Sequence, residues 1–313
     1  MNSVLLNQTS AALRKAALNE EAKAYILSDP ALFNTLKKAA NRYMGGDTLE
    51  ETIVKVKDQN RIGFKCSIEF MGESTHTMQE ANDARDEFIN VIREIKHQGL
   101  RSAVSLDLSH IGLAVSHDLC LENLNLICLE AMAANIEINI SAEDSRRTDA
   151  VLKTYTKIAK IYPYVGITLQ AYLHRTKDDF VEIVKLNRRI KLVKGAFETP
   201  SGLSLPRGEQ LDSIYLDYAD RLLSKNHPCS IATHDHKIQQ EVKKLIARYH
   251  TDKNCYEFES LYGVQSEKLL KLKEEGHPAK VYFVYGKEWY LYLCNRLAEY
   301  PLNVFQAIKD IVG

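Results

Sequence analysis

The sequence has no excess of charge of either sign. Lysine plus arginine and aspartate plus glutamate each number 41 among the 313 residues, so the formal net charge is zero. Proteins that bind nucleic acid or anionic membranes electrostatically carry clustered positive charge, which this balance does not suggest. We therefore expect a small-molecule partner and no nucleic acid.

The cysteines lack the spacing of a metal site. No C-x-x-C pair occurs, which argues against a zinc site. The scatter is typical of isolated thiols in a reducing compartment, and we expect these residues in or near the core. The six cysteines are Cys66, Cys120, Cys128, Cys229, Cys255 and Cys294.

Long apolar runs are also missing. No stretch approaches the roughly 20 apolar residues that a membrane-spanning helix needs. Residues 1–27 alternate charged and apolar positions at helical spacing and lack the continuous apolar core of a signal peptide. We expect a cytoplasmic protein without a transmembrane segment, and this test leaves a peripheral contact with the inner membrane open.

The first sixty residues have the pattern of helices. Three helices are predicted, over residues 11–27, 30–43 and 48–59. The second opens with Pro30 at a first-turn position, and the third follows a Gly-Gly-Asp turn. We expect a helical extension over residues 1–60, ahead of the main domain.

From residue 61 onward, short apolar runs alternate with longer amphipathic segments. Eight runs are typical of strands: 63–70, 102–108, 136–140, 165–170, 190–193, 230–233, 256–258 and 281–284. Such alternation predicts parallel strands joined by right-handed crossovers, and eight units can close into a barrel. The rival is an open doubly wound sheet, whose G-x-G-x-x-G fingerprint is missing. We predict an α/β fold, a (β/α)₈ TIM barrel over residues 61–313.

Polar residues gather just past the predicted strands, where such barrels place their active sites. The Lys194-Gly195-Ala196 turn pairs a cation with a residue that allows close backbone approach, which suits a phosphate or the pyrimidine edge of a flavin; a tight loop with a solvated lysine is the alternative. The other polar residues at these ends include Glu73, Asp107, Ser141, Glu143, Gln170, Thr233, His234, Glu259 and Tyr282.

Two further patterns allow a functional and a structural interpretation. His234 and His236 flank Asp235, but without a third ligand at fixed spacing they favour hydrogen bonding over a metal site. Near the C-terminus, Tyr292, Arg296 and Glu299 share one face of a predicted helix over residues 288–299. That face could look into the barrel mouth, or it could carry a solvated Arg–Glu pair.

Several of these segments resemble the barrel motifs of monofunctional bacterial proline dehydrogenases, in the order in which that family has them. The resemblance covers the chain from about residue 42 to the C-terminus. It rests on RYMGGDTLEE (42–51), EFMGES (69–74), AEDS (142–145), LQAYLHR (169–175), LVKGAF (192–197), ATHD (232–235), YEFESLYG (256–263) and YFVYGKEWYLYLCNRLAEYPLNV (282–304).

The resemblance implies a distorted barrel that binds FAD without a Rossmann domain. It also implies oxidation of the carbon next to a secondary amine, with electrons passing to a quinone or another acceptor. Positions that match cofactor contacts are Gln170, Lys191, Val193, Lys194, Gly195, Ala196, Thr233, His234, Glu259, Arg296 and Glu299. Positions that match the substrate pocket are Leu261, Tyr282, Tyr292 and Arg296, together with Asp107, Ser141 and Asn295.

The last three of these positions depart from the family pattern. Asp107 stands where the family has a lysine, Asn295 where it has an arginine, and Ser141 where it has an aspartate; Lys191 also replaces an arginine. Losing cations around a substrate carboxylate weakens binding of free proline.

Three hypotheses follow from these departures. The enzyme oxidises a modified, cationic or carrier-linked amine, or it is an ordinary proline dehydrogenase that has drifted. In the third, a degenerate barrel acts as a non-catalytic ligand-binding or regulatory protein.

Overall fold

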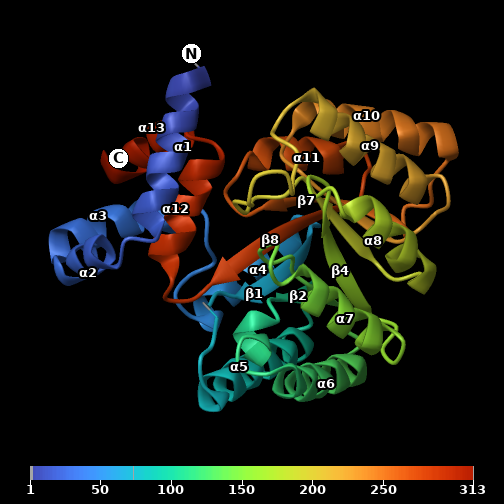
Figure 1. The fold of residues 1–313 in the computed structure, drawn as a ribbon, viewed down its shortest axis with the longest axis horizontal. Coiled ribbons are helices and arrows are strands. Elements are labelled where there is room, and N and C mark those ends of the chain that lie inside the picture. Colours follow the sequence, from blue (N-terminus) through green and yellow to red (C-terminus); the bar gives the residue numbers. More distant parts are fainter. Residues whose placement is uncertain (1–2, 73, 313) are drawn as a thin grey trace.

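Eight parallel strands form a barrel that closes on itself in chain order (Figure 1). The computed structural model describes residues 3–72 and 74–312, so the candidate Glu73 lies outside the described residues. The predicted (β/α)₈ fold is confirmed, and the open sheet is excluded because β1 pairs with β8. The strands are β1 (Lys65–Phe70), β2 (Ser102–Leu106), β3 (Ile138–Ile140), β4 (Val165–Gln170), β5 (Ile190–Val193), β6 (Cys229–Ala232), β7 (Tyr256–Leu261) and β8 (Ala279–Tyr285).

Amphipathic helices cover the outside of the barrel. In α5, Ala81, Phe88 and Ile92 are buried at helical spacing, and Thr77 and Glu80 close a capping box at its start. The wall helices are α5 (Met78–His97), α6 (His117–Ala134), α7 (Thr148–Ala159), α8 (Thr176–Ile183), α9 (Glu209–Leu223), α10 (His236–Tyr249) and α11 (Ser266–Glu274), with short turns of helix η1 (Ser109–Leu113) and η2 (Val184–Leu186).

Four helices precede the barrel: α1 (Ser3–Ala17), α2 (Glu20–Ser28), α3 (Pro30–Asn41) and α4 (Leu49–Arg61). The predicted single helix over residues 11–27 is wrong. Helix α1 ends just before Leu18. The Asn19 side chain then accepts a hydrogen bond from the Ala22 N–H and caps the start of α2. The other two predicted helices are confirmed, with Asp29 and Thr48 as their N-caps.

The barrel departs from regular geometry where β8 meets β1. Helix α4 contacts both of these strands and so covers the outer wall between them. Helix α12 (Trp289–Glu299), which follows β8, instead packs against α1 and α3. Together with α2 and α13 (Asn303–Val312), these helices form a lobe beside the barrel, which brings the first and the last described helices together (Figure 1).

Two apolar cores hold these parts together. The larger fills the space between the strands and the wall helices, where Ile68, Val104 and Phe88 are fully buried. The smaller joins the lobe to the barrel through Tyr43, Tyr282 and Trp289. All six cysteines are free thiols, five of them buried. Within residues 3–72 and 74–312, no helix combines the length and apolarity that crossing a bilayer requires.

Candidate active site

The inside of the barrel is lined with charged and polar side chains. Bulky branched apolar residues usually fill this space in such barrels. Along each strand, residues alternate between the apolar core outside and the lumen inside. In β1, Cys66 and Ile68 pack outward, while Lys65, Ser67 and Glu69 bond to residues on the lumen side of β2 and at the two ends of β3.

A continuous series of ion pairs, here called the charge ladder, crosses the N-terminal part of the lumen. Lys65 Nζ lies 3.1 Å from Glu137, and Glu137 pairs with Arg189 at 2.5 Å. Arg189 lies 3.6 Å from Glu257, which also pairs with Lys280. The ladder consists of Lys65, Glu137, Arg189, Glu257, Lys280, Glu259 and Lys191.

The top of the ladder reaches the mouth of the barrel. Glu259 pairs with Lys280 through one oxygen, at 3.5 Å, and with Lys191 through the other. The Lys191 ammonium lies 3.8 Å from the centroid of the Tyr282 ring, a cation–π contact. The Tyr282 hydroxyl donates to Glu69, and burial, together with this carboxylate, raises the pKa of the phenol well above its ordinary value.

Two buried carboxylates, Glu69 and Asp107, lie close together above this point. The Ser141 hydroxyl donates to Glu69 at 2.8 Å. Burial raises the pKa of Asp107, and the neighbouring Glu69 and Glu143 raise it further. Burial likewise raises the pKa of Glu69. We call Glu69, Asp107 and Ser141 the acidic mouth.

Helix α12 brings an aromatic ring and a guanidinium group to the same end of the barrel. Arg296 pairs with Glu299 at 2.7 Å and stacks on the Tyr292 ring, 4.9 Å from its centroid. The Tyr292 hydroxyl and Arg296 Nε are buried, and neither has a hydrogen-bond partner in the described structure. Asn295 precedes this arginine and is partly exposed. The predicted helical face therefore carries an Arg–Glu ion pair. Its two buried polar atoms without a hydrogen-bond partner among the described residues are the Tyr292 hydroxyl and Arg296 Nε.

The strand ends of β5 and β6 hold the predicted lysine-glycine turn. Lys194 Nζ bonds to Asp212 at 2.5 Å and to Asp235 at 2.8 Å. Gly195 has φ +110°, and a Cβ there would collide with the Tyr172 ring. This close approach is available only to glycine. Val193 ends β5 just before this turn, and Ala196 follows it.

Neighbouring polar groups are held by backbone contacts. His234 Nε2 accepts a hydrogen bond from the Leu261 N–H at 3.1 Å. Burial, with the nearby Arg296 charge, lowers the pKa of His234 to about 4, so the ring is neutral near pH 7. The Thr233 hydroxyl accepts from the Asp235 N–H, and the Gln170 amide donates to the Glu143 carbonyl. His236 starts α10 on the exposed surface.

The family is decided by comparison with known proteins. The model of the proline dehydrogenase family matches residues 52–303, most of the chain. The chain belongs to the proline dehydrogenase family. This membership indicates an oxidoreductase and confirms the resemblance read from the sequence.

Individual proline dehydrogenases give the same result. Proline dehydrogenase 2 of Bacillus subtilis (strain 168) is 33% identical over 273 residues, covering 87% of this chain and 90% of that protein. Proline dehydrogenase of Deinococcus radiodurans is 29% identical over 278 residues, with the same coverage. Among solved structures, proline utilization A (PutA) from Bdellovibrio bacteriovorus inactivated by N-propargylglycine matches 94% of this chain with a TM-score of 0.80. It is 18% identical, and this chain spans 36% of it, so it supports the fold alone.

Glu69 is a residue of the candidate site that received no role in the sequence analysis. Glu69 lies inside EFMGES, one of the segments that carry the resemblance, yet only the structure joins it to Ser141 and Tyr282. A signal was present, because Lys65, Ser67 and Glu69 alternate with apolar residues in β1. Polar residues at every second position of a barrel strand indicate a polar lumen.

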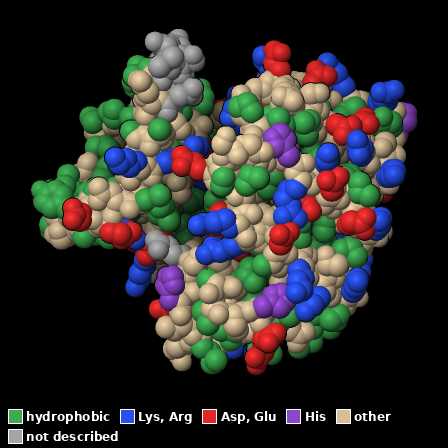
Figure 2. Space-filling model, viewed as in Figure 1, with side chains coloured by type: hydrophobic (Ala, Val, Ile, Leu, Met, Phe, Trp, Pro, Cys, Tyr) green, Lys and Arg blue, Asp and Glu red, His purple; other side chains and the backbone are tan. Residues whose placement is uncertain are grey.

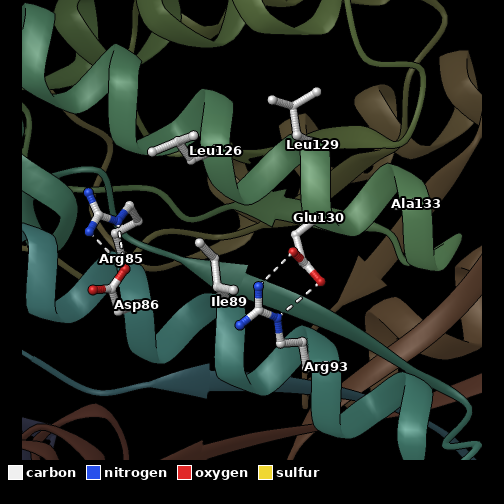
Figure 3. A pocket seen from close by; sticks show the side chains of 8 residues that line it. All are labelled: Arg85, Asp86, Ile89, Arg93, Leu126, Leu129, Glu130 and Ala133. Carbon is white, nitrogen blue, oxygen red and sulfur yellow. Dashed lines mark hydrogen bonds and ion pairs between the residues drawn. The ribbon is translucent and has the colours of Figure 1, made fainter.

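One surface hollow lies on the outer wall of the barrel, and another lies beside the barrel mouth near the end of β1. One groove of about 480 Å³ runs between α5 and α6 on the outer wall, where Arg93 and Glu130 pair across it (Figure 3). Another, of about 520 Å³, is lined by Phe70, Glu87 and His110. Figure 2 shows acidic and basic side chains intermixed over the visible face, without a large area of one sign.

Proposed function

We propose that the chain is an FAD-dependent oxidoreductase that oxidises the C–N bond of a secondary amine to an imine. We further propose that this amine carries a cationic or hydrogen-bond-donating group where the family places the proline carboxylate. One observation carries the second part: the acidic mouth presents two buried carboxylates, Glu69 and Asp107, and no ion pair joins either of them to a cation among the described residues.

The balance of charged side chains in the lumen supports a cationic group of the substrate at this position. The four cations of the ladder face three carboxylates, and Glu69 lies beside the uppermost cation, Lys191. Arg147 is paired with Glu143 at 3.3 Å, and Arg296 with Glu299. Asp107 has no ion pair among the described residues, and the neighbouring Glu69 and Glu143 repel its charge. A positively charged group of the substrate would relieve this repulsion, whereas a second carboxylate would increase it.

The residues of the mouth fit an FAD molecule. Lys194 supplies a cation beside a turn where Gly195 leaves no room for a side chain, and Lys191 supplies a second cation. The buried Tyr292 hydroxyl and Arg296 Nε lack protein partners, and such groups usually find one in a ligand or water. Gln170, Val193, Ala196, Thr233 and His234 would complete the contacts. When bound, FAD supplies the hydride acceptor, and the electrons then pass to a quinone or another acceptor.

The chain's own side chains would orient the amine and receive its proton. Leu261, Tyr282 and Tyr292 form the walls that hold the reacting carbon in place. Glu69 Oε2 already accepts hydrogen bonds from Ser141 and Tyr282. Because burial raises the pKa of Glu69, this carboxylate is suited to take the proton that the substrate ammonium must lose before oxidation.

The substrate is tested with purified protein and a dye acceptor. L-Proline, hydroxyproline, cyclic amines without a carboxylate and carrier-linked prolyl groups are compared by kcat/KM. Amines that carry a second cation or lack the carboxylate should be preferred by tenfold or more, the size of about one charge-assisted contact. Robust turnover of L-proline with a low KM would identify an ordinary proline dehydrogenase instead.

A reversal variant sharpens this test. Asp107→Lys combined with Ser141→Asp restores the charges that the family has at both positions. We expect preference to shift toward L-proline. The matched control is Asp86→Asn, which removes an exposed carboxylate on α5 and should leave the preference unchanged.

The non-catalytic alternative is tested by the visible spectrum of the purified protein. Lys194, Gly195, Tyr282, Tyr292 and Arg296 are retained together, which weighs against a barrel released from cofactor binding. Absorption typical of oxidised flavin supports the enzyme. Colourless protein that takes up no added FAD supports a ligand-binding or regulatory scaffold.

A further inference from the structure

We propose that Lys280 is a positioning residue for Lys191. Acting through Glu259, it holds the Lys191 ammonium beside Tyr282, at the edge of the lumen where the flavin would lie. This inference rests on the proposed function, because it concerns the surroundings of bound FAD.

The contacts form a direct relay. Lys280 is 3% exposed and touches no substrate-facing group in the described structure; it pairs with Glu257 and lies 3.5 Å from Glu259 Oε2. Glu259, 2% exposed, pairs with Lys191 through its other oxygen, Oε1. Glu257 is itself fixed by the Ser230 hydroxyl, which donates to it at 2.6 Å. Each member therefore has two partners that fix its position.

The charge states make this relay effective. Burial acts to lower the pKa of Lys280, but Glu257 and Glu259 raise it above its ordinary value. Burial acts to raise the pKa of Glu257, but Lys280 and Arg189 lower it below its ordinary value. Lys280 and Glu257 therefore both stay charged near neutral pH.

Lys191 needs such an anchor because two carboxylates attract its charge, one of them paired with it and the other farther away. Glu259 lies on the ladder side and Glu69 on the mouth side. A lysine side chain is a flexible four-carbon stem, so its ammonium follows the stronger local charge. With Lys280 present, the charge of Glu259 is shared between two ammonium groups. Without Lys280, Glu259 would hold Lys191 more tightly and draw it away from the mouth.

A fixed positive charge beside a flavin favours the reduced cofactor, so the relay has a measurable consequence. In FAD-loaded protein, Lys280→Met should lower the equilibrium constant for flavin reduction about tenfold, which is about 30 mV for a two-electron couple. The same substitution in a Lys191→Met background should change it less than twofold. The midpoint potential is measured by reductive titration against a reference dye.

Several outcomes overturn the inference. Equal shifts in the two backgrounds would mean that Lys280 acts by its own field, and no shift in either would mean that it does not act on the flavin. Lys65→Met, at the outer end of the ladder where the side chain is 33% exposed, is the matched control and should shift the equilibrium less than twofold.

A second variant decides the question if Lys280→Met does not fold. Glu259→Gln keeps the side-chain shape and frees Lys191 from its anchor, so it should raise the equilibrium constant in the native background and leave the Lys191→Met background within twofold. Protein that takes up no FAD would overturn the proposed function and this inference with it. FAD-loaded protein without the background dependence would overturn this inference alone.

Discussion

The charged side chains at the two ends of the barrel lumen differ in how they are paired. Toward the N-terminal ends of the strands, Arg189, Glu257 and Lys280 each face partners of opposite sign. Toward the C-terminal ends, no ion pair joins Glu69 or Asp107 to a cation among the described residues, and burial raises the pKa of both carboxyl groups. Buried charges that are paired are costly to break, whereas buried carboxylates without a paired cation have raised pKa values, and such groups cluster at functional sites. The comparison therefore separates structural charges from functional ones.

The largest effect should come from breaking the ladder. Lys280→Met leaves Glu257 and Glu259 buried with one cation fewer, so the free energy of unfolding should fall by about 3 to 5 kcal/mol. Urea unfolding measures the change. Adding Glu257→Gln should recover part of the loss. As a control, Arg93→Met removes the exposed pair with Glu130 and should cost at most about 1 kcal/mol.

The second-largest effect should be a loss of folding stability at acid pH. Burial lowers the pKa of His110, beside the mouth, from 6.5 to about 4. The unfolded chain therefore binds more protons between these values, so stability is complete above pH 6.5 and falls by about 3 kcal/mol on acidification to pH 4.

This pH dependence is checked by unfolding curves across the same range. His110→Gln should lose this part of the slope, whereas His97→Gln, which alters an exposed side chain, should keep it. An unchanged slope in the His110 variant would show that this histidine does not titrate as its burial requires.

A smaller effect, on binding rather than folding, is expected at α12. Arg296→Met removes the guanidinium that stacks on Tyr292, so KM for the substrate should rise about tenfold or more with the fold intact. Steady-state kinetics with a dye acceptor, together with a circular dichroism spectrum, measure both properties. An unchanged KM would remove Arg296 from the site.

The smallest effect should have the opposite sign to the first. Asp107→Asn removes a carboxylate whose pKa burial and Glu69 raise. Such a raised pKa costs stability as pH rises above the unfolded value, so the variant should be about 1 kcal/mol more stable at pH 8, with the gain shrinking toward pH 4. If neutralising Asp107 destabilises the protein instead, the contrast between the two ends of the lumen is lost.

Much of the architecture could be predicted because it depends on local patterns. Apolar runs of strand length and amphipathic helices of regular spacing recur from residue 61 onward, and they indicated the closed barrel. The helix boundary at Leu18 was missed, because the apolar spacing continues past it while the Asn19 cap is a single-residue signal. The path of α12 could not be predicted, since its packing on α1 and α3 joins opposite ends of the chain.

The residues of the candidate site also fall into two groups, those that local sequence segments indicate and those that only the fold brings together. Lys194, Tyr282, Tyr292 and Arg296 could be predicted as site residues because they lie within segments that resemble the family. The relay from Lys280 through Glu259 to Lys191 could not be, because it joins three different strands across the lumen.

By itself, the sequence determined the order of the strands and helices, the family, and which positions carry unusual charges, since these are written in periodicity and residue identity. Only the tertiary structure decided which charges neutralise one another and which remain at the mouth. Ion pairing depends on distances of a few ångströms between side chains far apart in the chain, and closing the barrel sets those distances.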